Sequence, residues 1–197
     1  MPSQTRSAKA RILSSRVVHE GPVFSVTVDQ VEEPGGIRAR RDVIQHAGSV
    51  VILAVAGSAR APEVLLERQY RHATRQFLWE LPAGRVEPGE NVLAGAKREL
   101  LEETGFKAKR WKRIFTYFAS PGFLSETMTT YLATELTPGP AHPENEEFIK
   151  TRFFPLPSLL AMVDSGRMRD GKTLSAVLWL ENQRLRSLGR RTVRTRS

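Results

Sequence analysis

The stretch that decides the fold is residues 84–106, GRVEPGENVLAGAKRELLEETGF. Residues 85–89 form a segment rich in turn-forming residues, which predicts a loop. Residues 91–104 show helical periodicity, because their apolar residues recur three and four positions apart at Leu93, Ala96 and Leu100. Gly105 follows, in the position where glycine commonly ends a helix. The stretch therefore predicts a loop that leads directly into a helix.

Carboxylates are concentrated on the predicted helix. Glu99 and Glu103 are four residues apart and share one face, and Glu102 lies on the adjoining edge. Like charges at this spacing repel, so a helix gains nothing from them unless a cation compensates. A hard divalent cation with oxygen ligands, such as Mg²⁺, is the natural candidate. Glu90 lies at the loop–helix junction, where a carboxylate suits the helix dipole. Arg98 is placed to pair with Glu90 or a neighbouring carboxylate and to hold the loop against the helix.

The complete spacing resembles the Nudix box: Gly, five residues, Glu, seven residues, Arg-Glu-Leu, any residue, Glu-Glu, any residue, Gly and an apolar residue. Every fixed position is met between Gly84 and Phe106, nine constrained positions across 23 residues. A solvated acidic helix face held by Arg–Glu pairs would account for the glutamates but not for this spacing. The resemblance implies that Glu90 and Arg98 organise the loop of the catalytic centre.

This resemblance implies the fold and the chemistry. The expected class is α+β with a mixed sheet, the Nudix α/β/α sandwich, together with a small N-terminal antiparallel β subdomain. The expected activity is that of a Mg²⁺-dependent pyrophosphatase in which Mn²⁺ can substitute. By analogy Glu99 and Glu103 are the main metal ligands, Glu102 binds a further ion or its waters, and the carbonyl of Ala83 is an extra ligand.

Features outside the box resemble the ADP-ribose pyrophosphatase subfamily. Pro121 lies fifteen residues beyond the box, where that subfamily has a marker proline, although a turn after a strand would also place a proline there. Gln-Tyr-Arg at residues 69–71, followed by Trp-Glu-Leu-Pro-Ala-Gly at 79–84, looks like the same subfamily. Arg71 would then reach a substrate phosphate, and Glu80 would hold substrate or help to position metal. A surface ion pair and a strand-edge charge are the alternative explanations of these two residues.

The general base in this subfamily is usually a glutamate on a loop after the last core hairpin. Here that loop carries Glu144, Glu146 and Glu147. By position Glu147 is the first choice for the base and Glu146 the second, because a carboxylate within reach of a metal-bound water is chemically sufficient. An ordinary acidic loop is the alternative.

The nucleotide pocket is expected to involve the N-terminal region. Phe24 is a candidate for stacking on adenine, and Arg41 or Arg40 for contacting the nucleotide. Packing in the core of an alternating strand is the other explanation of a lone phenylalanine.

The rest of the chain predicts strands before the box and strands and helices after it. An extended segment at 17–31 and a strand at 37–45 flank a turn, which indicates a hairpin, and the apolar run at 49–56 predicts a central buried strand. A final helix is expected at 173–185, with an apolar stripe formed by Leu174, Val177, Leu178 and Leu185. The expected domain organisation is a basic flexible N-terminus, a β subdomain exchanged across a homodimer, the Nudix domain and a basic tail, at residues 1–16, 17–47, 48–185 and 186–197.

The net charge of +9 belongs to the two ends of the chain. Residues 1–18 and 182–197 carry ten basic residues and no acidic one, which leaves 20 basic against 21 acidic residues between them. Solvated tails explain this pattern, and a weak contact with a polyanion such as RNA is the alternative. The chain has no cysteine, which excludes disulfides. Without a long apolar run or a signal-type N-terminus, we expect a cytoplasmic protein that makes no use of a membrane.

Two classes of function are compatible with these features. The first is hydrolysis of ADP-ribose to AMP and ribose 5-phosphate, with GDP-mannose, a dinucleoside polyphosphate or capped RNA as alternative substrates of the same chemistry. The second is a non-catalytic Nudix module that binds nucleotide or RNA. Such modules typically lose box glutamates, and this chain keeps all of them, which favours the enzyme.

Overall fold

The computed structural model describes residues 9–139 and 149–194. These residues fall into two compact units. The first comprises the described part of residues 1–48 together with residues 117–128. The second comprises residues 49–116 together with the described residues from 129 onward.

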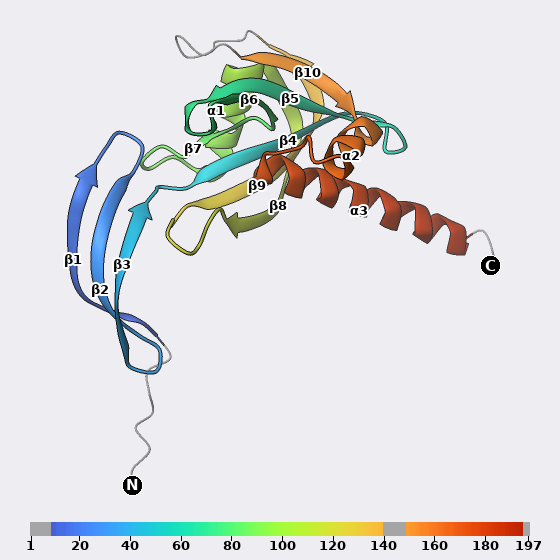
Figure 1. Cartoon of the computed structure of the whole chain (residues 1–197). Helices are drawn as coiled ribbons and strands as arrows, with labels where there is room; N and C mark the ends of the chain where they lie inside the picture. The colour runs from blue at the N-terminus through green and yellow to red at the C-terminus, as the bar shows by residue number, and fades with distance from the viewer. Residues whose placement is uncertain (1–8, 140–148, 195–197) are drawn as a thin grey trace. The chain divides into compact units, whose positions relative to one another are not determined.

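The first unit contains a three-stranded antiparallel sheet in the order β1-β2-β3 (Figure 1). Its strands are β1 (Arg11–Glu20), β2 (Ser25–Glu33) and β3 (Ile37–Gln45). The turn between β2 and β3 contains Gly35 and Gly36 at φ values of 89° and 79°, a backbone conformation that glycine adopts without steric cost. The predicted hairpin is therefore confirmed.

The beginning of the chain differs from the prediction in two ways. The extended segment expected at residues 17–31 is divided, because the chain turns where the N–H of Gly21 donates to the carbonyl of Phe24 at 3.0 Å. Strand β1 also starts at Arg11, within the segment expected to be flexible. Its pairing with β2 extends along the whole strand, and this inter-strand ladder is what orders the segment.

The second unit is built on a seven-stranded sheet with the order β10-β5-β4-β9-β8, in which β6 pairs with β5 and β7 pairs with β4. The strands are β4 (Ser49–Gly57), β5 (Pro62–Arg71), β6 (Gln76–Glu80), β7 (Ala83–Arg85), β8 (Phe106–Phe118), β9 (Thr127–Pro138) and β10 (Lys150–Pro155). The apolar strand β4 lies in the middle of the sheet, with its first six residues buried, as predicted. On β5, Val64, Leu65 and Leu66 are all buried, so both faces of the sheet are covered.

Helix α1 (Val92–Thr104) covers one of these faces. Asn91 caps its N-terminus by accepting hydrogen bonds from the N–H groups of Leu93 at 2.9 Å and Ala94 at 3.4 Å. Gly105 ends the helix in the left-handed conformation, as predicted. The buried stripe of α1, Ala96 and Leu100, packs in one cluster with residues of β4, β5 and β9.

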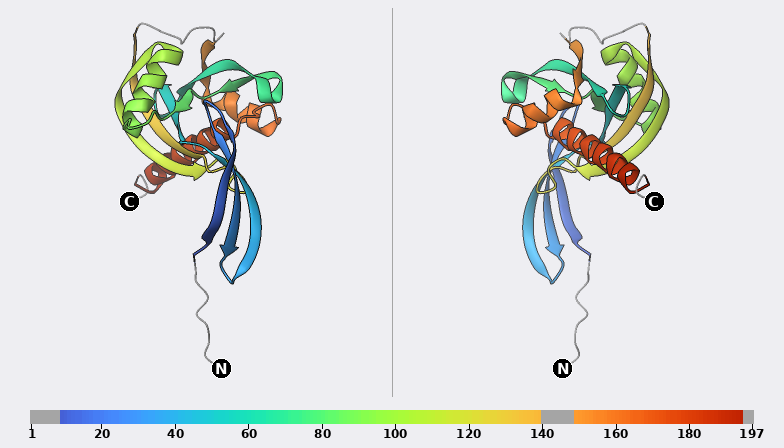
Figure 2. Two further views of the ribbon diagram at one scale, coloured as in Figure 1. Left: turned by 90° about the vertical axis from the view of Figure 1, so that its left-hand side faces the viewer. Right: turned by 90° about the vertical axis from the view of Figure 1, so that its right-hand side faces the viewer.

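The other face is covered by α2 (Leu156–Asp164) and α3 (Gly171–Arg194), which completes a three-layered sandwich (Figures 1 and 2). Helix α3 continues well beyond the predicted end at residue 185. Its arginines and leucines are good helix formers, and Glu181 and Arg184 form an ion pair three residues apart at 2.6 Å. The predicted apolar stripe is only partly right: Val177 is buried, but Leu178 and Leu185 are exposed. No helix among the described residues is long and apolar enough to cross a membrane.

The cap of α1 yields a test of what holds the box helix. We expect Asn91→Ala to lower the free energy of unfolding by about 1 kcal/mol, because two backbone N–H groups lose their acceptor. Urea unfolding of the full chain measures the change. Asn91→Asp keeps a capping oxygen and should retain most of the stability. Equal midpoints for Asn91→Ala and the wild-type protein would show that the cap is not stabilising.

Candidate functional site

Arg98 joins the box loop to the box helix. Its guanidinium donates to the two carboxylate oxygens of Glu90 at 3.1 and 3.2 Å and to the carbonyl of Arg85 at 3.1 Å. It also pairs with Glu99 and Glu102, each at 2.9 Å. The hydrogen bonds from Arg98 hold the pKa of Glu90 below its usual range. One cation therefore offsets three carboxylates and closes the loop on the helix, which agrees with the expected Arg98–Glu90 pair.

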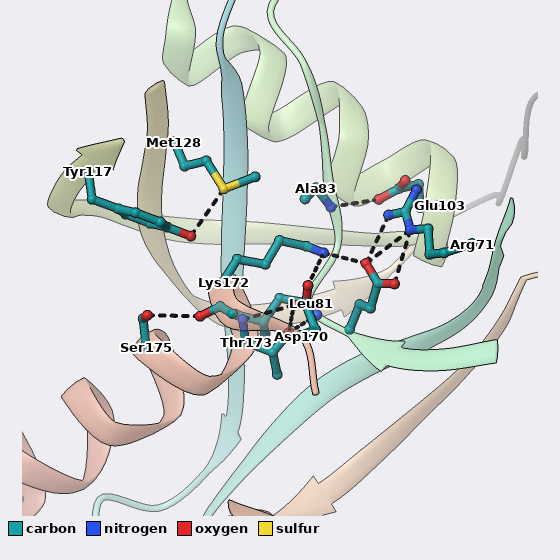
Figure 3. Close-up of polar contacts among 12 residues, drawn as sticks. Arg71, Leu81, Ala83, Glu103, Tyr117, Met128, Asp170, Lys172, Thr173 and Ser175 are labelled. Carbon is teal, nitrogen blue, oxygen red and sulfur yellow. Dashed lines mark hydrogen bonds and ion pairs between the residues drawn. The ribbon is translucent and has the colours of Figure 1, made fainter. Parts of the chain in front are cut away.

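Gly84 is required by the close approach of Glu99. A Cβ atom at residue 84 would lie 2.0 Å from the carboxylate of Glu99, far closer than a real contact allows. Beside it, the N–H of Ala83 donates to Glu103 at 3.1 Å, drawn in Figure 3. The carboxylates of Glu99 and Glu103 thus both lie against the backbone of β7. A side chain at residue 84 would displace Glu99, which explains why a glycine begins the box.

A second set of charges is centred on Glu80, and its two cations, Arg71 and Lys172, are labelled in Figure 3. Glu80 is 1% exposed, and Arg71 donates to its two oxygens at 2.9–3.2 Å. Lys172, at the start of α3, also pairs with Glu80 and with Asp170, the latter at 3.1 Å. Burial alone would raise the pKa of Glu80, but the hydrogen bonds and charges of Arg71 and Lys172 outweigh it and lower the pKa. Glu80 is therefore a buried ionic centre rather than a charge at a strand edge.

The first turn of α3 holds the chain just ahead of the box. The hydroxyl of Thr173 accepts a hydrogen bond from the N–H of Leu81 at 2.8 Å and donates to Asp170 at 2.6 Å. Asp170 also accepts from the backbone N–H of Thr173 at 3.0 Å. These contacts come from the sequence Asp-Gly-Lys-Thr at residues 170–173, which sequence reasoning did not assign to the site. Its capping pattern, an aspartate three residues before a threonine, was the signal that could have assigned it this role.

Sequence reasoning missed Glu67, a charged residue in the middle of β5. It is fully buried, and no hydrogen-bond donor among the described residues reaches either of its carboxylate oxygens. The carboxyl group of Glu103 lies within hydrogen-bonding reach, but two ionised carboxylates are both acceptors. Burial raises the pKa of Glu67 to about 7, against the lowering effect of the Lys172 and Arg71 charges. The signal was a glutamate two residues after Leu65, on the face of the strand that this buried residue shares.

The structure places the other predicted site residues as follows. Arg71 lies beside Glu80 in the second unit, whereas Pro121, Phe24 and Arg41 belong to the first. Phe24 is not a core residue of an alternating strand: it lies in the β1–β2 turn, 40% exposed, with its ring 5.7 Å from that of His19. Arg41 pairs with Glu33 at 2.6 Å. Glu144, Glu146 and Glu147 lie outside the described residues.

The box glutamates are directed to different partners. Glu99 and Glu102 contact Arg98, and Glu103 contacts β7. Within residues 9–139 and 149–194, no group of three or more His, Cys, Asp or Glu side chains is gathered to hold a metal ion. A cation bound here would therefore have to compete with Arg98 for these oxygens and take further ligands from backbone or water.

Comparison with known proteins gives a consistent result. The NUDIX domain family model matches residues 45–177. The chain is 32% identical over 178 residues to an ADP-ribose pyrophosphatase of Bacillus subtilis (strain 168), covering 89% of this chain and 95% of that protein. It is 27% identical to a GDP-mannose pyrophosphatase of Escherichia coli (strain SMS-3-5 / SECEC), covering 94% and 99%. The crystal structure of an ADP compounds hydrolase superposes with a TM-score of 0.76 at 24% identity, covering 92% of this chain and 97% of that one, which shows the same fold.

The raised pKa of Glu67 predicts an unusual pH dependence of stability in the metal-free protein. The folded state holds this proton up to about pH 7, whereas the unfolded chain releases it near the ordinary value of 4.5. Stability contributed by the protonated form is therefore present below pH 4.5 and is lost as the pH rises to 7. We expect Glu67→Gln to gain stability relative to the wild-type protein between pH 5 and pH 8, measured by urea unfolding with a chelator. Parallel pH profiles of the two proteins would contradict this.

Proposed function

The chain belongs to the NUDIX domain family, and from that premise we propose that it hydrolyses the pyrophosphate bond of ADP-ribose to AMP and ribose 5-phosphate. One observation carries the proposal. The complete box folds into a loop and helix closed by Arg98, in a chain that matches an ADP-ribose pyrophosphatase over 95% of that relative's length. The similarity to a GDP-mannose pyrophosphatase favours that nucleotide sugar as the alternative substrate.

We propose Mg²⁺ as the cofactor, with Mn²⁺ as a substitute, because the donor set at the box consists of oxygen atoms. The residues that would hold it are Glu99, Glu102 and Glu103 with the carbonyl of Ala83. The cradle that Gly84 leaves for the Glu99 carboxylate is the structural feature that fits this role. When bound, the metal would activate a water molecule and offset the charge of the pyrophosphate.

The residues of the chain supply orientation and proton transfer. Arg71 is fixed by its paired hydrogen bonds to Glu80, yet its side chain remains 38% exposed, so it is placed to contact a substrate phosphate. Arg98 and Glu90 keep the loop closed on the box helix. For the general base we propose Glu147, with Glu146 as the second candidate, since either carboxylate would accept a proton from the attacking water.

The nucleotide is proposed to contact the N-terminal unit. Phe24 exposes part of its ring in a turn, which leaves a face on which a purine can stack. Arg41 is exposed on β3 and held by Glu33, so it is available to a phosphate or ribose. Pro121 lies in the turn after β8, and we assign it to the same substrate-contacting group by its position relative to the box.

We further propose a homodimer formed through the N-terminal sheet. This sheet has three strands, and large apolar side chains on it and its connecting turn are at least 40% exposed: Ile12, Leu13, Val17, Val18, Val23, Phe24 and Ile37. An exposed apolar surface of this kind is typical of an interface between protein chains. The partner proposed for this apolar surface is the same sheet of a second copy of the chain, which presents the same apolar residues.

The substrate proposal is tested by hydrolysis of a panel that contains ADP-ribose, GDP-mannose, diadenosine polyphosphates and capped RNA with Mg²⁺. We expect ADP-ribose to be cleaved fastest, with AMP as the product. Glu103→Gln should lower kcat about a hundredfold or more, because metal activation is worth several kcal/mol. Product analysis by chromatography identifies the bond that is cut.

Glu63→Gln is the matched control, since Glu63 lies exposed on β5, away from the box. It should retain wild-type turnover. Faster hydrolysis of GDP-mannose would refute ADP-ribose as the substrate but would support the proposed pyrophosphatase chemistry. Binding without turnover of any compound in the panel would instead support the non-catalytic module.

The dimer is tested by light scattering of the full chain, for which we expect a mass twice the 22.1 kDa of one chain. Ile12→Lys should shift the protein towards the monomer, because a charge buried in an apolar interface is costly. Ala59→Lys, an equal charge change in an exposed loop of the second unit, should leave the mass unchanged. A wild-type monomer at working concentration would refute the proposed interface.

A further inference from the structure

Glu67 and Glu103 bring two carboxyl groups together from different elements of the second unit. Glu67 comes from the middle of β5 and is opposite Glu80 of β6 in the strand register. Glu103 comes from the last turn of α1 and reaches both the N–H of Ala83 and the carboxyl of Glu67. A helix and two strands thus bring three acidic side chains together, of which Glu67 and Glu80 are buried and Glu103 is half-buried.

The two cations near Glu67, Arg71 and Lys172, are paired with other carboxylates. Arg71 donates to Glu80 at 2.9–3.2 Å, and Lys172 pairs with Glu80 and Asp170. They act on Glu67 through their charge, whereas none of the described donors makes a hydrogen bond to its oxygens. With all groups ionised, the carboxylates in this cluster outnumber the two cations, which leaves a net negative charge.

A buried carboxylate that lacks a hydrogen-bond donor is costly unless it is paired with a cation or bound to a metal. Glu67 is fully buried, so bulk solvent does not compensate its charge. A divalent cation placed between Glu67 and Glu103 would give both carboxylates a partner. Oxygen ligands from two directions suit Mg²⁺ and Mn²⁺, which fill their remaining positions with water or substrate phosphate.

We propose that Glu67 supplies an additional carboxylate, from outside the box, to the divalent-cation site that includes Glu103. This inference rests on the metal dependence in the proposed function and extends it to a residue on β5. In this arrangement β5 supplies a ligand of the cation, Glu67, and four residues later a group that binds the substrate phosphate, Arg71. The strand would then fix the position of the metal relative to the group that binds the substrate.

The test is Mn²⁺ binding to the full, metal-free chain without nucleotide, measured by electron paramagnetic resonance of the free ion at pH 8. We expect Glu67→Gln to weaken Mn²⁺ affinity about 10–100-fold, the loss typical when a group supporting a metal site is removed. Glu67→Asp keeps a carboxylate and should restore part of the affinity. Glu63→Gln makes the same chemical change at an exposed position of the same strand and should bind Mn²⁺ as the wild-type protein does.

Glu67→Gln preserves the shape of the side chain and removes a buried charge, so the variant should fold. The Mg²⁺-induced rise in Tm gives a second measurement, which should be smaller in this variant than in the wild-type protein. If Glu103→Gln loses Mn²⁺ while Glu67→Gln binds it normally, Glu67 is only a protonated buried acid, and this inference alone is overturned. If the wild-type chain binds no Mn²⁺, the metal dependence in the proposed function fails as well.

Discussion

Repulsion between closely packed carboxylates is the constraint on which the rest of this site depends. The box concentrates Glu90, Glu99 and Glu102 around one guanidinium, and Arg98 holds all three within about hydrogen-bonding distance. Deeper in the protein, Glu80 is offset by Arg71 and Lys172. The loop, the box helix and β5 are held in place by these pairs, whereas Glu67 is left without a paired cation.

Helix α3 has a structural role that reaches into the site. Its first turn places Lys172 on Glu80 and Thr173 on the N–H of Leu81, two contacts that span 92 residues of sequence. The chain between β6 and β7 is thereby fixed on one side by α3. On the other side it is fixed by α1, through Glu103 and the N–H of Ala83. The backbone that approaches the box carboxylates is thus held from both faces of the sandwich.

The two units contribute different parts of the proposed activity. The second unit carries the box and Arg71, which concern the pyrophosphate that all candidate substrates share. The first unit carries Phe24 and Arg41, the residues proposed for nucleotide contact, and the exposed apolar side chains of the proposed dimer.

The sequence by itself determined the local features: the loop and helix of the box, the end of that helix at Gly105, and the buried central strand β4. These follow from periodicity and from residue preferences within a few positions, which act over short stretches of chain. Only the tertiary structure decided which groups surround Glu67, Glu80 and Glu103, where β1 begins, and that Phe24 lies in an exposed turn. Those outcomes depend on strand pairing and on contacts between residues far apart in the chain, and the charge on a buried glutamate depends on which neighbours the fold brings to it.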